Sequence, residues 1–152
     1  MSENPILRVL VVDDTVVYRK IVSDVLAELP NVEVVGAAHN GKAALLKVKT
    51  LKPDLLTLDI EMPEVNGLEV LAELQKTAPH VGAVMLSTLT SEGGVMTMKA
   101  LELGAFDFIP KPQSGTMTAN KRAVQKALEP ILTAFSRSQR MLSRLPKSRP
   151  AA

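Results

Sequence analysis

Apolar runs alternate with amphipathic stretches along this chain. Residues Leu7 to Val12 form a nearly continuous aliphatic run, which is typical of a strand buried on both faces. In the stretch that follows, apolar residues recur at helical spacing, which predicts a helix that begins at a cap formed by Asp14 or Thr15 and ends before Pro30. The chain therefore opens with a strand followed by a helix.

Four further strand and helix pairs repeat this plan. The expected strands cover residues 33–37, 55–58, 83–86 and 105–109. The expected helices cover residues 41–51, 67–77 and 93–103, followed by a last helix with one apolar face made of Val124, Leu128, Ile131, Leu132 and Phe135. Strands that alternate with helices across short loops favour a parallel sheet covered on both faces. The predicted fold class is therefore α/β.

The last part of the chain differs from the rest. Pro130 lies inside the last helix, and because an internal proline costs about 3 kcal/mol, we expect a bend or a break near Glu129. Residues 137–152 lose apolar density and gain proline, serine and arginine. We therefore interpret residues 6–136 as one folded domain and residues 137–152 as a basic linker.

The formal net charge of +2 conceals an uneven distribution. Residues 1–130 contain 13 Lys and Arg and 16 Asp and Glu, a net charge of −3, while residues 131–152 contain five basic residues and no acid, a net charge of +5. Residues 137–152 also lack aromatic side chains, so a solvated linker explains them better than a nucleic-acid site does.

Composition excludes several other classes. The chain has no cysteine, so it has neither disulfides nor thiolate metal ligands. No apolar run approaches the roughly 20 residues that a membrane span requires. The N-terminus lacks the basic and apolar regions of a secretory signal. We expect a cytoplasmic protein without membrane or nucleic-acid partners.

Charged residues follow three of the predicted strands. Asp13 and Asp14 follow the first strand, Asp59 follows the third, and Lys111 follows the fifth. Because the carboxyl ends of parallel strands lie together, we expect three carboxylates and one ammonium in a single crevice. Each residue alone is ordinarily a cap or a loop residue, but clustered carboxylates repel one another unless a cation is present. Mg²⁺ favours carboxylate, carbonyl and phosphate oxygens, so the crevice predicts a site for Mg²⁺ and a phosphoryl group.

Four motifs in this order resemble the receiver domain of two-component response regulators. They are Val11-Val12-Asp13-Asp14, Asp59-Ile60-Glu61-Met62-Pro63 with Asn66-Gly67, Met85-Leu86-Ser87-Thr88, and Gly104-Ala105 through Lys111-Pro112. The resemblance covers residues 6 to about 136 and implies a flavodoxin-like, doubly wound sheet of five parallel strands in the order 2-1-3-4-5. Within this family, the motifs are most similar to the receiver of the chemotaxis protein-glutamate methylesterases, the CheB family.

The resemblance implies a role for each residue of the crevice. Asp59 is expected to be the nucleophile that accepts a phosphoryl group from a histidine kinase. Asp14 and Asp59 are expected to bind Mg²⁺ directly, Asp13 is expected to bind it through water, and the backbone carbonyl of Glu61 completes the ligands. Lys111 and the metal are expected to neutralise charge on the transferring phosphoryl oxygens.

Ser87 and Phe108 are the expected switch residues. The resemblance implies that the Ser87 hydroxyl donates to a phosphoryl oxygen once Asp59 is modified, and the alternative is a hydroxyl that caps its own strand. Phe108 stands where the family carries an aromatic ring that turns inward on phosphorylation. Phe106 shares the same face of the strand, so packing explains either ring equally well.

Two further features follow from the same resemblance. The family carries a cis peptide bond at the position of Lys111-Pro112. Glu61 departs from the commoner receiver pattern, because it adds a carboxylate at the mouth of the acidic crevice. There it would weaken metal binding or bias the approach of water to the acyl phosphate.

The expected function is that of a phosphorylation-dependent regulatory receiver in chemotaxis signalling. A chemotaxis-type histidine kinase would phosphorylate Asp59, and the face formed by the fourth helix, fifth strand and fifth helix would act on a C-terminal methylesterase domain. The present chain shows no Ser, His and Asp triad after Ser136, so we expect phosphoacceptor and autodephosphorylation chemistry without esterase activity. The alternative is a standalone receiver that acts by phosphorylation-dependent protein binding.

Two other classes fit less well. A flavodoxin-like electron carrier would bind a phosphate at its first loop, where Asp13 and Asp14 would repel it. A phosphatase of the haloacid dehalogenase type would carry an Asp-x-Asp motif after its first strand, whereas Asp59 is followed by Ile60-Glu61 and then Pro63.

Overall fold

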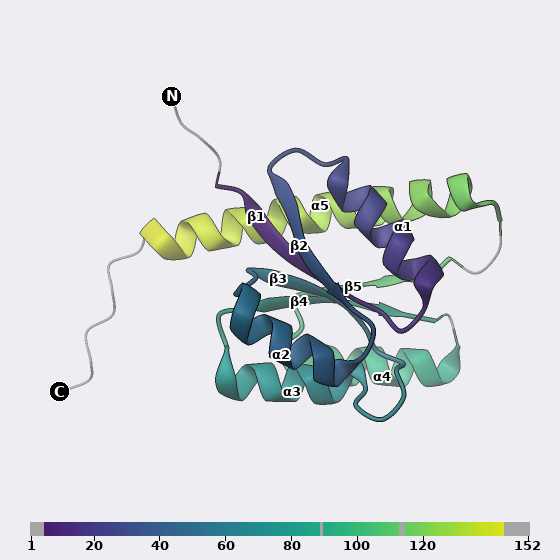
Figure 1. Cartoon of the computed structure of the whole chain (residues 1–152), viewed down its shortest axis with the longest axis horizontal. Helices are drawn as coiled ribbons and strands as arrows, with labels where there is room; N and C mark the ends of the chain where they lie inside the picture. The colour runs from purple at the N-terminus through teal and green to yellow at the C-terminus, as the bar shows by residue number, and fades with distance from the viewer. Residues whose placement is uncertain (1–4, 89, 113–114, 145–152) are drawn as a thin grey trace.

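Strands and helices alternate in a computed structural model that describes residues 5–88, 90–112 and 115–144. The elements are β1 (Leu7–Val12), α1 (Val16–Ala27), β2 (Val32–Ala38), α2 (Gly41–Leu51), β3 (Leu55–Asp59), α3 (Gly67–Thr77), β4 (Gly82–Ser87), α4 (Ser91–Glu102), β5 (Asp107–Pro110) and α5 (Met117–Arg144). The strands form one parallel sheet in the order β2-β1-β3-β4-β5, which confirms the flavodoxin-like fold (Figure 1).

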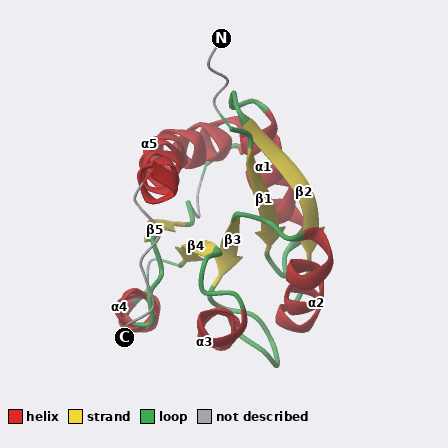
Figure 2. Cartoon of the chain, turned by 90° about the vertical axis from the view of Figure 1, so that its left-hand side faces the viewer, coloured by secondary structure: helices red, strands yellow, loops and turns green. Residues whose placement is uncertain are grey.

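Helices cover the sheet on both faces. α1 and α5 lie on one face, while α2, α3 and α4 lie on the other (Figure 2). β1 shows why its sequence is almost continuously apolar: Val9 and Val11 pack toward α1 and α5, whereas Leu10 and Val12 pack toward the opposite helices. Successive side chains of a strand point to opposite faces, so both sets must be apolar when both faces are covered.

The strand register gathers the chemistry at one edge of the sheet. Val12 pairs with Leu58, which places the residues after β1 beside the end of β3. Asp59 pairs with Leu86, and the next residue of β4, Ser87, pairs with Pro110. The carboxyl ends of β1, β3, β4 and β5 therefore meet, as predicted for a doubly wound sheet.

The element bounds follow local signals closely. The helices predicted over residues 41–51 and 67–77 have those bounds, and each begins after an asparagine whose side chain accepts a backbone N–H of the first turn. Thr15, one of the two caps expected for α1, accepts from the backbone N–H of Tyr18. β5 begins at Asp107, so Ala105 and Phe106, which were predicted as part of the strand, lie before it.

Of the bend or break expected near Glu129, the break is wrong. α5 is one continuous helix with Pro130 inside it. Pro130 and Lys126, the residue whose carbonyl loses its N–H partner to the proline, are both exposed. The opposite face of the helix buries three large side chains, Leu128, Leu132 and Phe135. Burial of each contributes about 1.5–3 kcal/mol, which together exceeds the roughly 3 kcal/mol cost of the proline.

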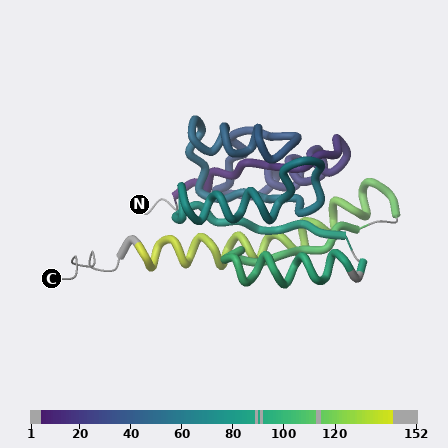
Figure 3. Tube along the Cα trace, turned by 90° about the horizontal axis from the view of Figure 1, so that it is seen from below, coloured from purple at the N-terminus to yellow at the C-terminus, as the bar shows by residue number. Residues whose placement is uncertain are grey.

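The last turns of α5 project beyond the rest of the described chain (Figure 3). The helix continues through residues 137–144, which belong to the segment predicted as a linker, and residues 145–152 lie outside the described residues. Met141 and Leu142 are largely exposed on this projection. Among the described residues, no helix combines the length and hydropathy needed to cross a bilayer.

Candidate functional site

Three carboxylates cluster at the carboxyl edge of the sheet. Asp13 and Asp14 follow β1, Asp59 ends β3, and one oxygen from each lies within 4.8 Å of the others. Asp13 and Asp59 are each only 1% exposed, whereas Asp14 is exposed at the mouth of the crevice. The structure therefore brings together the acidic residues that the sequence placed at neighbouring strand ends.

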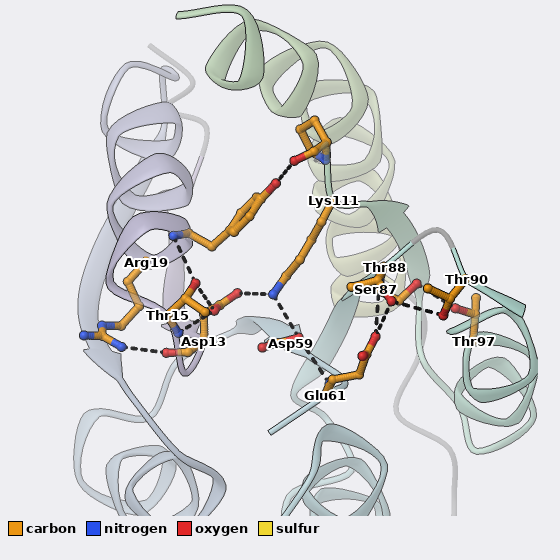
Figure 4. Close-up of polar contacts among 12 residues, drawn as sticks. Asp13, Thr15, Arg19, Asp59, Glu61, Ser87, Thr88, Thr90, Thr97 and Lys111 are labelled. Carbon is orange, nitrogen blue, oxygen red and sulfur yellow. Dashed lines mark hydrogen bonds and ion pairs between the residues drawn. The ribbon is translucent and has the colours of Figure 1, made fainter. Parts of the chain in front are cut away.

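Lys111 supplies the positive charge inside this cluster. Its Nζ lies 3.0 Å from Asp13 Oδ2 and 3.1 Å from Asp59 Oδ1 (Figure 4). Its backbone N–H donates to the carbonyl of Ser87 at 2.8 Å, which holds the start of the β5–α5 loop against β4. Burial lowers the pKa of the Lys111 ammonium, but the charges of Asp59 and Asp13 outweigh that effect and raise the pKa above its ordinary value.

The peptide bond between Lys111 and Pro112 is trans, as are all other peptide bonds of the described residues. The resemblance implies a cis bond at this position. In this structure the ammonium group contacts both buried carboxylates with the trans bond in place.

Asp59 is electrostatically unusual. Burial raises the pKa of its carboxyl to about 7, the charge of Asp13 adds to the increase, and Lys111 opposes it only in part. Without a further cation, the Asp59 carboxyl therefore retains a proton at pH values where an ordinary aspartate is ionised.

The oxygens of Asp13 and Asp59 differ in what they already bind. Asp13 Oδ1 accepts from the backbone N–H and the hydroxyl of Thr15, at 2.9 and 2.8 Å, and its Oδ2 contacts Lys111. Asp59 Oδ1 accepts from the backbone N–H of Glu61 at 3.2 Å. Asp59 Oδ2 is buried and has no hydrogen-bond partner among the described residues. This open oxygen beside the Asp14 carboxylate fits a hard divalent cation, which prefers oxygen ligands.

Glu61 lies at the mouth of the crevice and binds the loop after β4. Its Oε1 accepts from the Thr88 hydroxyl at 2.6 Å and from the Thr88 backbone N–H at 3.3 Å (Figure 4). The extra carboxylate that the sequence placed near the site is thus engaged with Thr88. Nothing in the local sequence pattern pairs these two residues, which are 27 positions apart.

The Ser87 hydroxyl contacts α4. The hydroxyl of Thr97 donates to the Gly93 carbonyl at 2.8 Å and lies 2.9 Å from Ser87 Oγ. Because a hydroxyl has one hydrogen, Ser87 must be the donor to Thr97. Sequence reasoning considered a hydroxyl that caps its own strand and missed Thr97, since its partner depends on how α4 packs against β4.

The two phenylalanines near β5 have different environments. Phe106 packs edge-on against Phe135 of α5, with ring centroids 5.1 Å apart and an interplanar angle of 83°. Phe108 is 41% exposed. Packing therefore accounts for Phe106, whereas Phe108 is accessible on the surface and its role as a switch stays a prediction.

Comparison with known proteins agrees with this fold and site. The family model of the response regulator receiver domain matches residues 9–124. The match covers most of the chain and includes the three carboxylates, Ser87 and Lys111. The chain belongs to the response regulator receiver domain family.

Individual members of this family are similar to the chain in sequence and in fold. The chain is 58% identical over 146 residues to a protein-glutamate methylesterase/protein-glutamine glutaminase of Desulfotalea psychrophila, covering 96% of this chain but only 40% of that protein. The crystal structure of the response regulator domain of Thermotoga maritima CheB aligns with a TM-score of 0.74 and 44% identity, over 85% of this chain and 96% of that one. A CheX–CheY–BeF₃–Mg²⁺ complex from Borrelia burgdorferi aligns with a TM-score of 0.69 and 27% identity, over 85% and 89%.

Proposed function

We propose that this chain is the phosphorylation-controlled receiver of a chemotaxis protein-glutamate methylesterase. The observation that carries the proposal is the crevice in which Lys111 contacts Asp13 and Asp59 while Asp59 keeps one open, buried oxygen. The likeness to the Desulfotalea psychrophila protein supports the methylesterase assignment. Because the chain spans 40% of that relative, control of a methylesterase domain remains part of the proposal.

The geometry supports phosphoryl transfer to Asp59. A carboxylate oxygen of Asp59 attacks the phosphorus held on a histidine of a chemotaxis-type kinase, the phosphorus–nitrogen bond breaks, and the histidine recovers a proton. The Lys111 ammonium lies close enough to neutralise charge on the phosphoryl oxygens during transfer. The kinase acts on the chain inside the cell, so the proposal places the chain in the cytoplasm.

The donor set suits Mg²⁺, which would supply further positive charge beside the phosphoryl group. Asp14 and the open oxygen of Asp59 would hold it directly. Asp13 would act through water, since Thr15 and Lys111 already contact its oxygens. The backbone carbonyl of Glu61 would complete the protein ligands. The Borrelia burgdorferi complex, which contains Mg²⁺ and BeF₃, supports this assignment.

Phosphorylation would then shift the population of conformers at α4. A phosphoryl oxygen competes with Thr97 for the single hydrogen of Ser87, so the hydroxyl chain to Gly93 is exchanged for a bond inside the crevice. The exposed apolar side chains on α4 and near β5 form a surface that can report this change: Val95, Met98, Leu103 and Phe108. We assign this α4–β5–α5 face as the output surface, with Phe108 turning inward.

The test is intact-mass analysis after brief incubation with acetyl phosphate, with and without Mg²⁺. We expect one phosphoryl group on the protein only when Mg²⁺ is present. If no adduct forms and beryllofluoride does not bind, the phosphoacceptor function is wrong. The reading frame beyond codon 152 separates a receiver joined to a methylesterase from a standalone receiver that uses the same apolar surface to bind a partner.

The Lys111→Ala variant is expected to accept a phosphoryl group at Asp59 but to lose the response at α4. The ammonium contacts Asp59, so without it the phosphoryl group is no longer held where one of its oxygens competes for the Ser87 hydrogen, while the nucleophile remains. Amide chemical shifts of α4, measured with and without beryllofluoride and Mg²⁺, report the response.

Lys121→Ala provides the matched control. This lysine pairs with Asp24 on α1, outside the crevice, and is partly exposed. We expect wild-type shifts from this variant. A full wild-type response in Lys111→Ala would contradict the assigned role of Lys111.

A further inference from the structure

Tyr18 joins α1 to the loop that carries Lys111. Its ring lies beneath the lysine ammonium, with Nζ 4.8 Å from the ring centroid. Its hydroxyl donates to the carbonyl of Pro112, the residue after the lysine. A single side chain thus contacts both the functional group of Lys111 and the backbone that follows it.

The first turn of α1 is itself fixed to the crevice. The Thr15 hydroxyl accepts from the Tyr18 backbone N–H, and the same Thr15 side chain donates to Asp13. Arg19, the next residue, donates to the Asp13 carbonyl at 2.9 Å (Figure 4). Tyr18 is therefore presented from a turn whose position is set by the acidic residues of the site.

Lys111 needs such support because one of its two carboxylate partners changes during the reaction. Its ammonium now contacts Asp13 and Asp59, and Asp59 is the group whose carboxylate becomes an acyl phosphate. Lysine is a compact charge on a flexible stem, so the ammonium must keep its place while the Asp59 carboxylate is exchanged for phosphoryl oxygens. The face of an aromatic ring attracts a cation through its quadrupole, and this attraction is not consumed when Asp59 is phosphorylated.

We propose that Tyr18 is a positioning residue that holds Lys111 over the phosphoacceptor during phosphoryl transfer. The ring attracts the ammonium, and the hydroxyl secures the backbone at Pro112. Tyr18 does not touch the transferred group and acts through Lys111. The inference rests on the proposed function, since it assumes that Asp59 is the phosphoacceptor.

The test is a double-mutant cycle on the rate of phosphorylation by acetyl phosphate, followed by intact mass. In the wild-type background, Tyr18→Leu removes both contacts and is expected to slow the reaction about fivefold. Tyr18→Phe keeps the ring and is expected to stay within about twofold of the wild-type rate. In the Lys111→Ala background, Tyr18→Leu is expected to change the rate little, because its effect requires the lysine.

Two further variants keep the result interpretable. Val17→Ala alters an exposed neighbour on the same helix turn and is expected to leave the rate unchanged. Tyr18→Met repeats the loss of the ring with an unbranched side chain, in case leucine disturbs the fold.

The outcomes separate this inference from the proposed function. If the wild-type chain forms no adduct, the phosphoacceptor function fails and the positioning role fails with it. If the adduct forms but Tyr18→Leu slows Lys111→Ala as much as it slows wild type, Tyr18 does not act through the lysine and only this inference is overturned. A fivefold loss that disappears without Lys111, together with rescue by Tyr18→Phe, establishes the positioning role.

Discussion

The Asp59→Asn variant will form no phosphoryl adduct with acetyl phosphate, whatever the Mg²⁺ concentration. The amide at this position is not a nucleophile toward phosphorus, and it removes one of the negative charges that attract the metal. Lys111 contacts Asp13 as well as Asp59, so we expect the crevice to keep its shape in the variant. Intact-mass analysis under the conditions that phosphorylate wild type checks the result, and peptide mapping locates the wild-type adduct.

Asp54→Asn is the matched control, because Asp54 lies just before the other end of β3. Its carboxylate accepts from the backbone N–H of Arg8 at 2.9 Å, a role that an amide oxygen can also fill. We expect this variant to be phosphorylated at the wild-type rate. A phosphoryl adduct on Asp59→Asn would show that another side chain accepts the group.

The metal-free protein is expected to lose stability as pH rises from about 4 to about 7. The pKa of Asp59 is raised from 3.8 to about 7 by burial and by Asp13, so the folded state binds a proton that the unfolded state has released in this range. The free energy of unfolding therefore falls through this window. After allowance for water at the mouth of the crevice, the fall attributable to Asp59 is roughly 2 kcal/mol.

Urea denaturation across this pH range, in the presence of a chelator, measures the effect. Asp59→Asn should show a flatter profile and exceed wild type in stability at pH 8, because it has no carboxylate to ionise at this position. Saturating Mg²⁺ should also flatten the wild-type profile, since a bound cation favours the ionised carboxylate. A wild-type profile that rises from pH 4 to pH 7 relative to Asp59→Asn would contradict the direction of the pKa shift.

The bounds of most helices and strands could be predicted because caps and apolar periodicity are set by residues that are close together in the sequence. The helix that begins at Gly67 follows Asn66, which forms a reciprocal capping box with Glu69, and both residues are visible in the sequence. The helix break considered at Pro130 was wrong for the opposite reason. Its cost is local, whereas the burial that keeps α5 continuous depends on packing against the sheet and α1. The strand order came from the family resemblance, since periodicity alone does not specify it.

In the candidate site, too, some contacts could be predicted from the sequence and others could not. Strand ends predicted that Asp13, Asp59 and Lys111 would meet, because parallel topology alone brings those ends together. The contacts of Thr97 with Ser87 and of Tyr18 with Lys111 could not be predicted in that manner. They depend on the rotation and offset of α4 and α1 against the sheet, and an isolated threonine or tyrosine on a helix carries no pattern that reveals its partner.

Tyr18 is the chain's single tyrosine, and the chain has no tryptophan. Fluorescence excited at wavelengths longer than the phenylalanine absorption band therefore originates from one phenol. This phenol lies against the Lys111 ammonium and the Pro112 carbonyl. Any ligand that moves the lysine alters the surroundings of that phenol. The protein thus carries its own optical reporter at the crevice, and titrations can be followed without attaching a dye.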